Sequence, residues 1–196
     1  MPHPTRIAPA DRIPLFQKVA FSFGQSADSF ATTLMTNVMW MPFFNIGIGL
    51  SPVVLGFVLM VLCAWDAIID PIMGNISDNT RTRWGRRRPF IFVGAITTAL
   101  LYLLFWNFPG SVMNGTSWLT TASNWIPYFD TLGFTNVEKA QGAYLFVVGL
   151  VYYVSYASWS MPYYGLQLEL TPNYDERTRL TAVMAFVSKL TSIAAS

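Results

Sequence analysis

The chain has 196 residues, of which 53% are hydrophobic and 11% are charged, and its formal net charge is +2. Soluble domains carry about 25% charged residues, so this composition excludes a disordered chain, a basic nucleic-acid-binding protein and an ordinary water-soluble enzyme. The single cysteine and the single histidine exclude an internal disulfide framework and a histidine-based metal site. The composition therefore predicts an all-α membrane protein.

Hydropathy divides the chain into a polar, proline-rich segment over 1–19 and an apolar bundle over 20–196. A helix that spans a membrane needs about 20 mostly apolar residues. We expect four complete transmembrane helices and a truncated fifth, so that the bundle is incomplete. Their expected ranges are 20–44, 52–75, 89–107, 142–168 and 180–196.

The segments between these helices differ in character. A basic loop follows the second helix, which we expect to end at Gly74, and occupies 76–88. A longer loop over 108–141, rich in Gly, Ser, Thr, Asn and Trp, is expected to fold over the outer face. On the fourth helix, Pro162 is expected to interrupt the helix.

Lysine and arginine placement predicts the orientation. If the helices alternate in direction, ten of the twelve basic residues fall on one side of the membrane. The sequence therefore predicts a multi-pass protein of the inner or plasma membrane, with residues 1–19 in the cytoplasm. The ten residues are Arg6, Arg12, Lys18, Arg81, Arg83, Arg86, Arg87, Arg88, Arg177 and Arg179.

Acidic residues within the expected spans are the main functional signal, because each costs about 2.5–3.5 kcal/mol to insert. The second helix carries Asp66 and Asp70, whose i, i+4 spacing places them on one helical face. Two such carboxylates cannot both ionise easily at low dielectric without a cation. They can share a proton, pair with a base from another helix, or coordinate a hard cation such as Na⁺. The alternative is a role in helix packing alone.

The fourth helix combines hydroxyl groups and aromatic rings around Pro162. Sugars offer C–H faces for stacking and hydroxyls for hydrogen bonding, so this composition is typical of a hydrated sugar pocket. The alternative is that Tyr and Trp form interfacial belts and Ser allows close helix packing.

The most specific motif is the block Trp65 to Ala95, WDAIIDPIMGNISDNTRTRWGRRRPFIFVGA. Its Asp78 is placed to pair with one of the five arginines that follow. Such a charge cluster can latch one state of an alternating-access carrier, although topology alone also explains basic residues here. The cluster comprises Asp78, Arg81, Arg83, Arg86, Arg87 and Arg88.

This block resembles the glycoside–pentoside–hexuronide:cation symporter family, the melibiose permease-like group of the major facilitator superfamily, and GRRRPFI is also similar to sucrose transporters. The resemblance implies that the chain is the N-terminal part of a major-facilitator-type helical bundle. It further implies that Asp66 and Asp70 bind the coupling cation.

By the same resemblance, sugar contacts come from the first and fourth helices. The residues implicated in substrate binding are Asp28, Tyr156, Ser160 and Tyr164. Ser160 stands where melibiose permease-like proteins have an acidic residue. Lys189 on the fifth helix is a candidate charge partner for Asp66 or Asp70, or it reaches toward an interface.

The function implied is sugar or glycoside:cation symport by alternating access, coupled to Na⁺ or H⁺, without a resident cofactor or metal. The expected partners are a sugar, the cation, the lipid bilayer and a C-terminal half of the transporter that this chain lacks; no nucleic acid is expected. No nucleophile–base pair, phosphate loop or metal-ligand cluster indicates an enzyme. The alternatives are a half-transporter that pairs with a separate subunit, a membrane sugar sensor and an inactive fragment.

Overall fold

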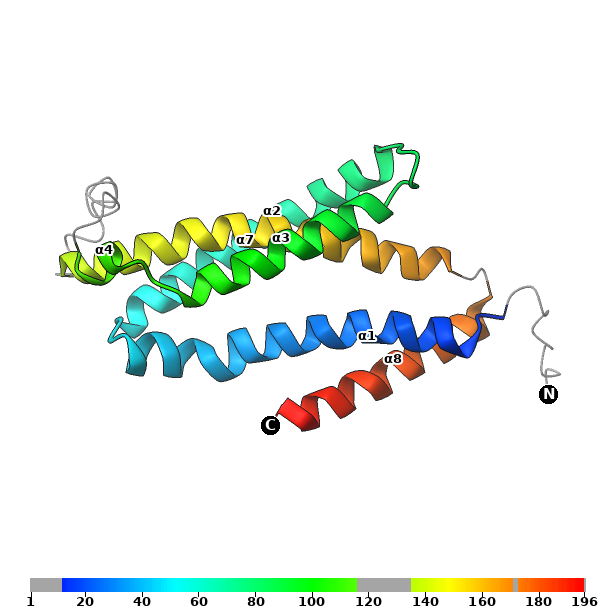
Figure 1. The fold of residues 1–196 in the computed structure, drawn as a ribbon, viewed down its shortest axis with the longest axis horizontal. Helices are drawn as coiled ribbons and strands as arrows, with labels where there is room; N and C mark the ends of the chain where they lie inside the picture. The colour runs from blue at the N-terminus through cyan, green and yellow to red at the C-terminus, as the bar shows by residue number, and fades with distance from the viewer. Residues whose placement is uncertain (1–11, 116–134, 171–172, 196) are drawn as a thin grey trace. The chain divides into compact units, whose positions relative to one another are not determined.

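Helices account for all the regular secondary structure that the computed structural model describes in residues 12–115, 135–170 and 173–195. Figure 1 shows their order along the chain. The elements are α1 (Leu15–Thr32), η2 (Thr33–Met39), η3 (Pro42–Gly47), α2 (Pro52–Asn79), α3 (Arg88–Trp106), α4 (Gly110–Met113), α7 (Asn136–Glu169) and α8 (Tyr174–Ala195), where η marks π-helical segments.

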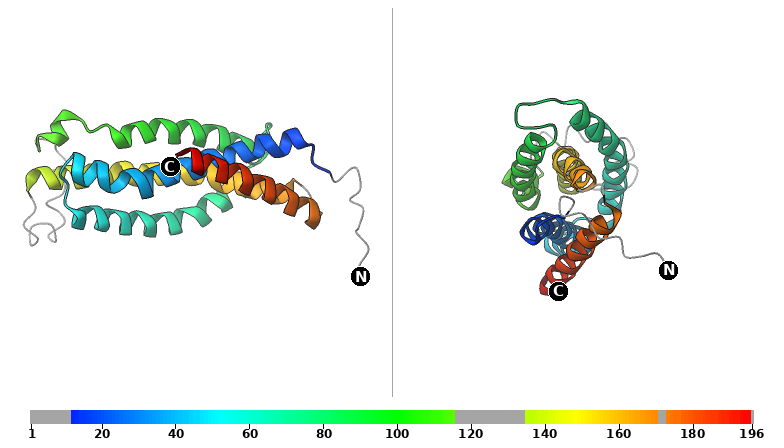
Figure 2. Two further views of the ribbon diagram at one scale, coloured as in Figure 1. Left: turned by 90° about the horizontal axis from the view of Figure 1, so that it is seen from below. Right: turned by 90° about the vertical axis from the view of Figure 1, so that its right-hand side faces the viewer.

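The described residues form two compact units. The first contains the residues up to Phe43 and those from Gly165 onward, and the second contains Phe44–Tyr164. In the second unit α2, α3 and α7 run side by side, and the views of Figures 1 and 2 agree on this arrangement. In the first unit α1 packs against α8.

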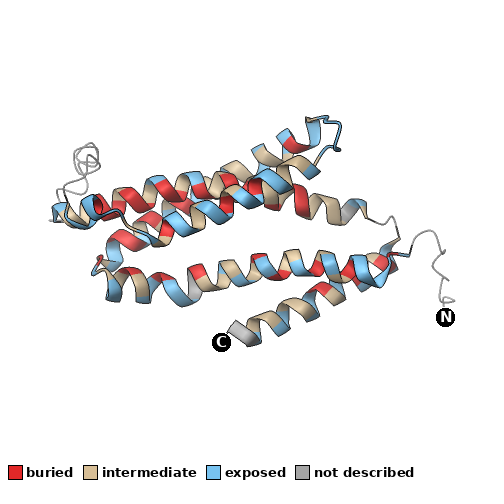
Figure 3. Cartoon of the chain, viewed as in Figure 1, coloured by how far each residue is buried: buried red, intermediate tan, exposed pale blue. Residues whose placement is uncertain are grey.

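Small residues allow the three helices of the second unit to approach closely. A Cβ atom at Gly94 of α3 would lie 2.9 Å from the backbone nitrogen of Trp159 on α7. A Cβ atom at Gly149 of α7 would lie 2.7 Å from a methyl group of Leu62 on α2. Buried residues are accordingly frequent on α7 (Figure 3), which is the most buried of the three. Close contact through small residues is a common way to pack helices in membranes.

Helix α2 begins where the sequence predicts but ends later. The Ser51 hydroxyl accepts a hydrogen bond from the Val53 N–H at 3.3 Å, and Pro52 occupies the first turn, as expected at a helix start. The predicted end at Gly74 is wrong, because the helix continues to Asn79. The φ angle of Gly74 is not positive, so this residue does not adopt the left-handed conformation that commonly ends helices.

Helix α7 starts six residues before the predicted position of 142. The Thr135 hydroxyl accepts a hydrogen bond from the Glu138 N–H, and the Glu138 carboxylate accepts one from the Thr135 N–H at 2.9 Å. This reciprocal pair is a capping box, which fixes a helix start. The remainder of the expected outer loop falls largely on residues 116–134, outside the described part of the chain.

The predicted interruption at Pro162 is also wrong, because α7 remains helical through that residue to Glu169. Helix α2 likewise continues through Pro71. Each proline removes one backbone hydrogen bond without breaking the helix, as transmembrane helices tolerate. Neither Pro71 nor Pro162 therefore marks a helix boundary.

The count of spans differs from the expected four and a fifth. Three described helices are long and apolar enough to cross a membrane: Pro52–Asn79, Arg88–Met113 and Asn136–Gln167. The expected first span is divided among α1, η2 and η3.

Helix α8 begins at Tyr174 rather than 180 because Asn173 caps it, and its first turn carries two acidic residues. Neither α1 nor α8 is among the three helices that qualify by length and composition.

Candidate functional site: a carboxylate pair on α2

The two aspartates that the sequence singles out lie one turn apart on α2. Asp66 and Asp70 are both half-buried. In each carboxylate, Oδ1 is buried and has no hydrogen-bond partner. Pro71 follows directly and cannot donate a backbone hydrogen bond to the Ala67 carbonyl, which lies between the two aspartates in the chain. This turn of α2 is therefore rich in oxygen atoms and poor in hydrogen-bond donors.

Helix α7 supplies the surroundings of the pair. The Trp65 Nε1–H donates a hydrogen bond to the Leu150 carbonyl at 3.3 Å, which ties α2 to α7 beside Asp66. The Tyr153 hydroxyl of α7 lies close enough to Asp66 and Cys63 of α2 to interact with them electrostatically. Sequence reasoning placed Tyr153 among the hydroxyl-bearing and aromatic residues of the expected pocket but missed the contact of Trp65. For Trp65 the available signal was its position next to an intramembrane carboxylate.

Aromatic rings form a continuous series along α7. Tyr156 stacks on Tyr152 with ring centroids 6.2 Å apart and meets Trp159 edge-on at 5.7 Å. Trp159 contacts Tyr163, which meets Tyr164 edge-on at 5.7 Å. The predicted sugar-binding residues Tyr156 and Tyr164 thus belong to one series of rings on one helix.

Ser160 differs from the other serine that the structure places nearby. Its side chain is fully buried and its Oγ has no hydrogen-bond partner. By contrast, the Ser158 hydroxyl donates to the Val154 carbonyl of its own helix at 2.8 Å. Because an unpartnered buried hydroxyl costs about 1–3 kcal/mol, Ser160 is the better candidate for a ligand contact.

The remaining predicted residues of the binding site belong to the other unit. Asp28 on α1 is buried, with 6% of its surface exposed, and Lys189 on α8 is exposed. Their placement near the α2 carboxylates, and the pairing of Lys189 with Asp66 or Asp70, stay predictions.

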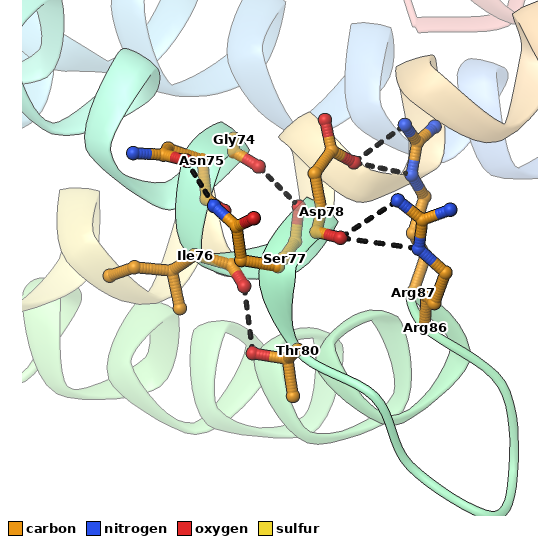
Figure 4. A network of polar contacts seen from close by, with 9 residues as sticks. Gly74, Asn75, Ile76, Ser77, Asp78, Thr80, Arg86 and Arg87 are labelled. Carbon is orange, nitrogen blue, oxygen red and sulfur yellow. Dashed lines mark hydrogen bonds and ion pairs between the residues drawn. The ribbon is translucent and has the colours of Figure 1, made fainter.

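The charge cluster after α2 contains the ion pair that its sequence suggests (Figure 4). Arg87 donates through Nε and Nη2 to Asp78 Oδ1, at 2.9 and 2.6 Å. Arg86 donates to the Asp78 backbone carbonyl at 2.8 and 3.2 Å. One aspartate therefore orders two consecutive arginines, whereas Arg81, Arg83 and Arg88 are exposed.

A second ionic contact, which sequence reasoning missed, joins α1 and α8. Glu176 is 1% exposed, and its carboxylate binds the Lys18 ammonium and accepts a hydrogen bond from the Ile13 N–H at 3.1 Å. The hydrogen bond from Lys18 lowers the pKa of Glu176 below its ordinary value. Ile13 also packs with Leu180 and Met184. Lys18 was read only as a topology signal, and nothing in the local sequence links it to a residue so distant.

The described residues contain no group of three or more His, Cys, Asp or Glu side chains that could hold a metal ion.

Comparison with known proteins identifies the family. The model of the MFS/sugar transport protein family matches residues 20–196. The chain belongs to this family. The family consists of transport proteins rather than enzymes. The chain is therefore an integral membrane protein of a transporter family and not an enzyme.

Several curated proteins are similar to this MFS/sugar transport chain. The uncharacterized symporter sll1374 of Synechocystis sp. is 32% identical over 88% of the chain and 28% of its own length. The lactose permease of Lactobacillus helveticus is 32% identical over 62% of the chain and 16% of its own length. The putative glycoside/cation symporter YagG of Escherichia coli is 34% identical over 44% of the chain and 19% of its own length.

The chain thus spans less than a third of the length of each of these three relatives. No solved structure matches it.

Proposed function

We propose that this chain is the N-terminal part of a carrier that moves a sugar or glycoside together with a cation. The observation that carries the proposal is the Asp66–Asp70 pair: two half-buried carboxylates, one turn apart inside a candidate membrane span, each with an unpartnered buried oxygen. Membership of a sugar transport family and similarity to proteins named as symporters support it.

Electrostatics explains why this pair would need a cation. Each carboxylate inside a membrane span is costly, and a second negative charge one turn away raises the cost further. A proton shared by the pair, or a Na⁺ ion held between carboxylate oxygens, removes most of this repulsion. The doubly ionised pair without a cation is therefore the less stable form, and binding of H⁺ or Na⁺ from solution is favourable.

The sugar would bind beside this pair through α7. The rings of Tyr156 and Tyr164 offer faces on which the C–H groups of a sugar can stack, and the unpartnered Ser160 hydroxyl offers a hydrogen bond. Asp28 of α1, a buried carboxylate, is the proposed acceptor for sugar hydroxyls. Each buried polar group left unpaired by a wrong sugar would cost about 1–3 kcal/mol, which provides specificity.

Coupling follows from reciprocal binding. Cation binding neutralises Asp66 and Asp70 and favours a sugar beside them, and by linkage the sugar favours the cation to the same degree. The loaded carrier then reorients between inward- and outward-facing states. The Asp78–Arg87 pair and the arginines around it would latch one of these states on the cytoplasmic side.

The proposed topology keeps four spans and the beginning of a fifth. We place α1 from residue 20, with η2 and the start of η3, as the first span, α2, α3 and α7 as the next three, and α8 from residue 180 as the fifth. The N-terminus and the loop between α2 and α3 then lie in the cytoplasm. The C-terminal half of the carrier is the partner against which this bundle would move, as the length of the relatives suggests.

The test is uptake by the carrier in proteoliposomes, measured with a panel of sugars under an imposed Na⁺ or H⁺ gradient. D70N is expected to abolish gradient-driven accumulation, because the remaining carboxylate cannot hold the cation alone. D175N, which removes an exposed carboxylate at the start of α8, is the matched control and should retain accumulation. Unchanged uptake and unchanged cation stimulation in D70N would end the assignment.

A further inference from the structure

The loop between α2 and α3 presents basic side chains in a fixed geometry. It contains five arginines between 81 and 88, and Asp78 is the one acidic residue between 76 and 90. Asp78 binds Arg87 through its carboxylate and Arg86 through its backbone carbonyl. These contacts, drawn in Figure 4, hold one end of the loop against the end of α2.

The middle of the loop is a tight turn. The Gly85 N–H donates to the Thr82 carbonyl at 3.1 Å, and the φ angle of Gly85 is +104°. Arg83 and Trp84 therefore occupy the two central positions of the turn. Both are exposed, and Trp84 has 61% of its surface exposed. The tip of the loop therefore presents an exposed arginine and an exposed tryptophan next to each other.

The neighbouring helices place this tip at the level of lipid headgroups. Helix α2 has 28 residues, so it is about 42 Å long at 1.5 Å per residue. A bilayer measures about 40–45 Å including its headgroup layers. Because both flanking helices are candidate spans and only eight residues connect them, the loop cannot extend far beyond the headgroups.

We propose that Arg81, Arg83 and Arg88, together with Trp84, form a binding surface for the phosphate headgroup of an anionic phospholipid. Arginine recognises phosphate oxygens through its planar array of N–H donors. The Trp84 ring would lie at the membrane–water boundary, where tryptophan is enriched. The Asp78 side chain and backbone carbonyl bind Arg87 and Arg86 rather than these three arginines. These arginines also belong to the proposed cytoplasmic latch, but lipid binding at this surface requires neither a sugar nor a coupling cation.

The experiment is a titration of phosphatidylglycerol into the detergent-solubilised chain, with binding measured by native mass spectrometry. Each basic residue near an anionic lipid surface contributes about 1 kcal/mol, or about fivefold in binding. The double variant R81Q/R83Q is therefore expected to weaken binding by about 25-fold. R81K/R83K, which keeps both charges, should lose far less and shows that the loop is not simply misfolded.

The matched control is R12Q/K139Q, which also removes two positive charges but outside the loop. It should bind phosphatidylglycerol like the unmodified chain. Equal weakening by both glutamine pairs would contradict a defined surface, and equal loss of phosphatidylcholine binding would contradict recognition of an anionic headgroup. Complete competition by soluble glycerol phosphate would also overturn the proposal, since it would show a site for a free phosphate.

Discussion

Hydroxyl groups on α7 divide into two kinds according to what their oxygen atoms contact. Ser158 bonds to its own helix, which satisfies the hydroxyl within the lipid-spanning region. Ser160 carries the same hydroxyl group and could also donate to its own helix, yet its buried Oγ has no hydrogen-bond partner. The same holds for one oxygen of each carboxylate on α2. Unsatisfied polar atoms of this kind are rare in folded proteins and call for an explanation.

A substitution at Ser160 tests whether that explanation is a ligand. S160A should weaken sugar affinity by about 2- to 10-fold, the effect of one neutral hydrogen bond, and should leave the thermal stability of the sugar-free protein unchanged. S158A is the control, because its hydroxyl is already bonded within α7. A sugar-binding titration with both variants measures the difference. Equal affinities in S160A and S158A would show that Ser160 makes no contact with the sugar.

Helix packing in the second unit depends on the positions of its glycines. At Gly94 an added Cβ atom would meet the Cβ and the backbone of Trp159 at 2.9 Å, and backbone atoms cannot move aside easily. We expect G94A to lower stability by about 1–3 kcal/mol through overpacking. G56A is the control, since no atom lies within 4 Å of the added Cβ at that position of α2. Thermal unfolding in detergent should show a large fall for G94A only; similar melting temperatures would contradict the α3–α7 contact.

The buried Glu176–Lys18 pair makes a separate prediction for α1 and α8. E176Q should lower stability by about 3 kcal/mol, because it leaves the Lys18 ammonium buried without its counter-charge. D175N, one residue earlier and exposed, should cost less than about 1 kcal/mol by weakening only the charge at the helix start. Thermal unfolding of the two variants at neutral pH makes the comparison.

The same pair predicts a pH dependence. The hydrogen bond from Lys18 lowers the pKa of Glu176 in the folded chain. As the pH falls, Glu176 is therefore protonated in the unfolded chain before it is protonated in the folded chain. The stabilisation is therefore complete above the ordinary pKa of 4.5 and is lost as the pH falls through the lowered folded value. The stability difference between the unmodified chain and E176Q should shrink below pH 4.5. A difference that stays constant on acidification would contradict an ionised Glu176.

At the level of elements, the sequence predicts the existence of helices better than their limits. The apolar stretches of α2, α3 and α7 are long enough to identify the helices, and Ser51-Pro52 marks the start of α2. Helices α2 and α7 extend into polar sequence beyond their predicted limits, whereas both ends of α3 lie within one residue of the prediction. The capping box of Thr135 and Glu138 was visible as a T-x-x-E pattern and would have placed the start of α7 correctly. Gly74 and Pro162 misled because their neighbours keep a helical backbone.

The candidate site was predictable in a similar, partial way. The cost of burying charge singles out Asp66 and Asp70 from composition alone. The contacts that surround them, such as the Trp65–Leu150 hydrogen bond, join residues far apart in sequence and leave no local pattern. Glu176 shows the same limitation, since its partners Ile13 and Lys18 lie at the other end of the chain. Glu176 lies one turn before the buried Leu180 and two turns before Met184 on α8, but a charged residue type does not indicate that it shares their buried face.

Over the whole molecule, the distribution of basic residues makes a topology prediction. In a C63A background, a single cysteine at Thr82 should react with a membrane-impermeant maleimide only after cells are permeabilised. A single cysteine at Asn107, exposed at the other end of α3, should react in intact cells. Labelling followed by a mass shift of the protein provides the measurement. The opposite labelling pattern would reverse the proposed orientation.

In the proposed mechanism, the α2 carboxylates link cation binding to sugar movement. The most direct measurement compares, in the same proteoliposomes, sugar accumulation driven by a cation gradient with sugar exchange at equilibrium, for the unmodified carrier, D66N, D70N and the control D175N. We predict that D66N and D70N lose gradient-driven accumulation while D175N retains it, and that exchange in D66N and D70N no longer depends on the cation. Accumulation at the unmodified level in D66N and D70N, with the same cation dependence, would contradict the account.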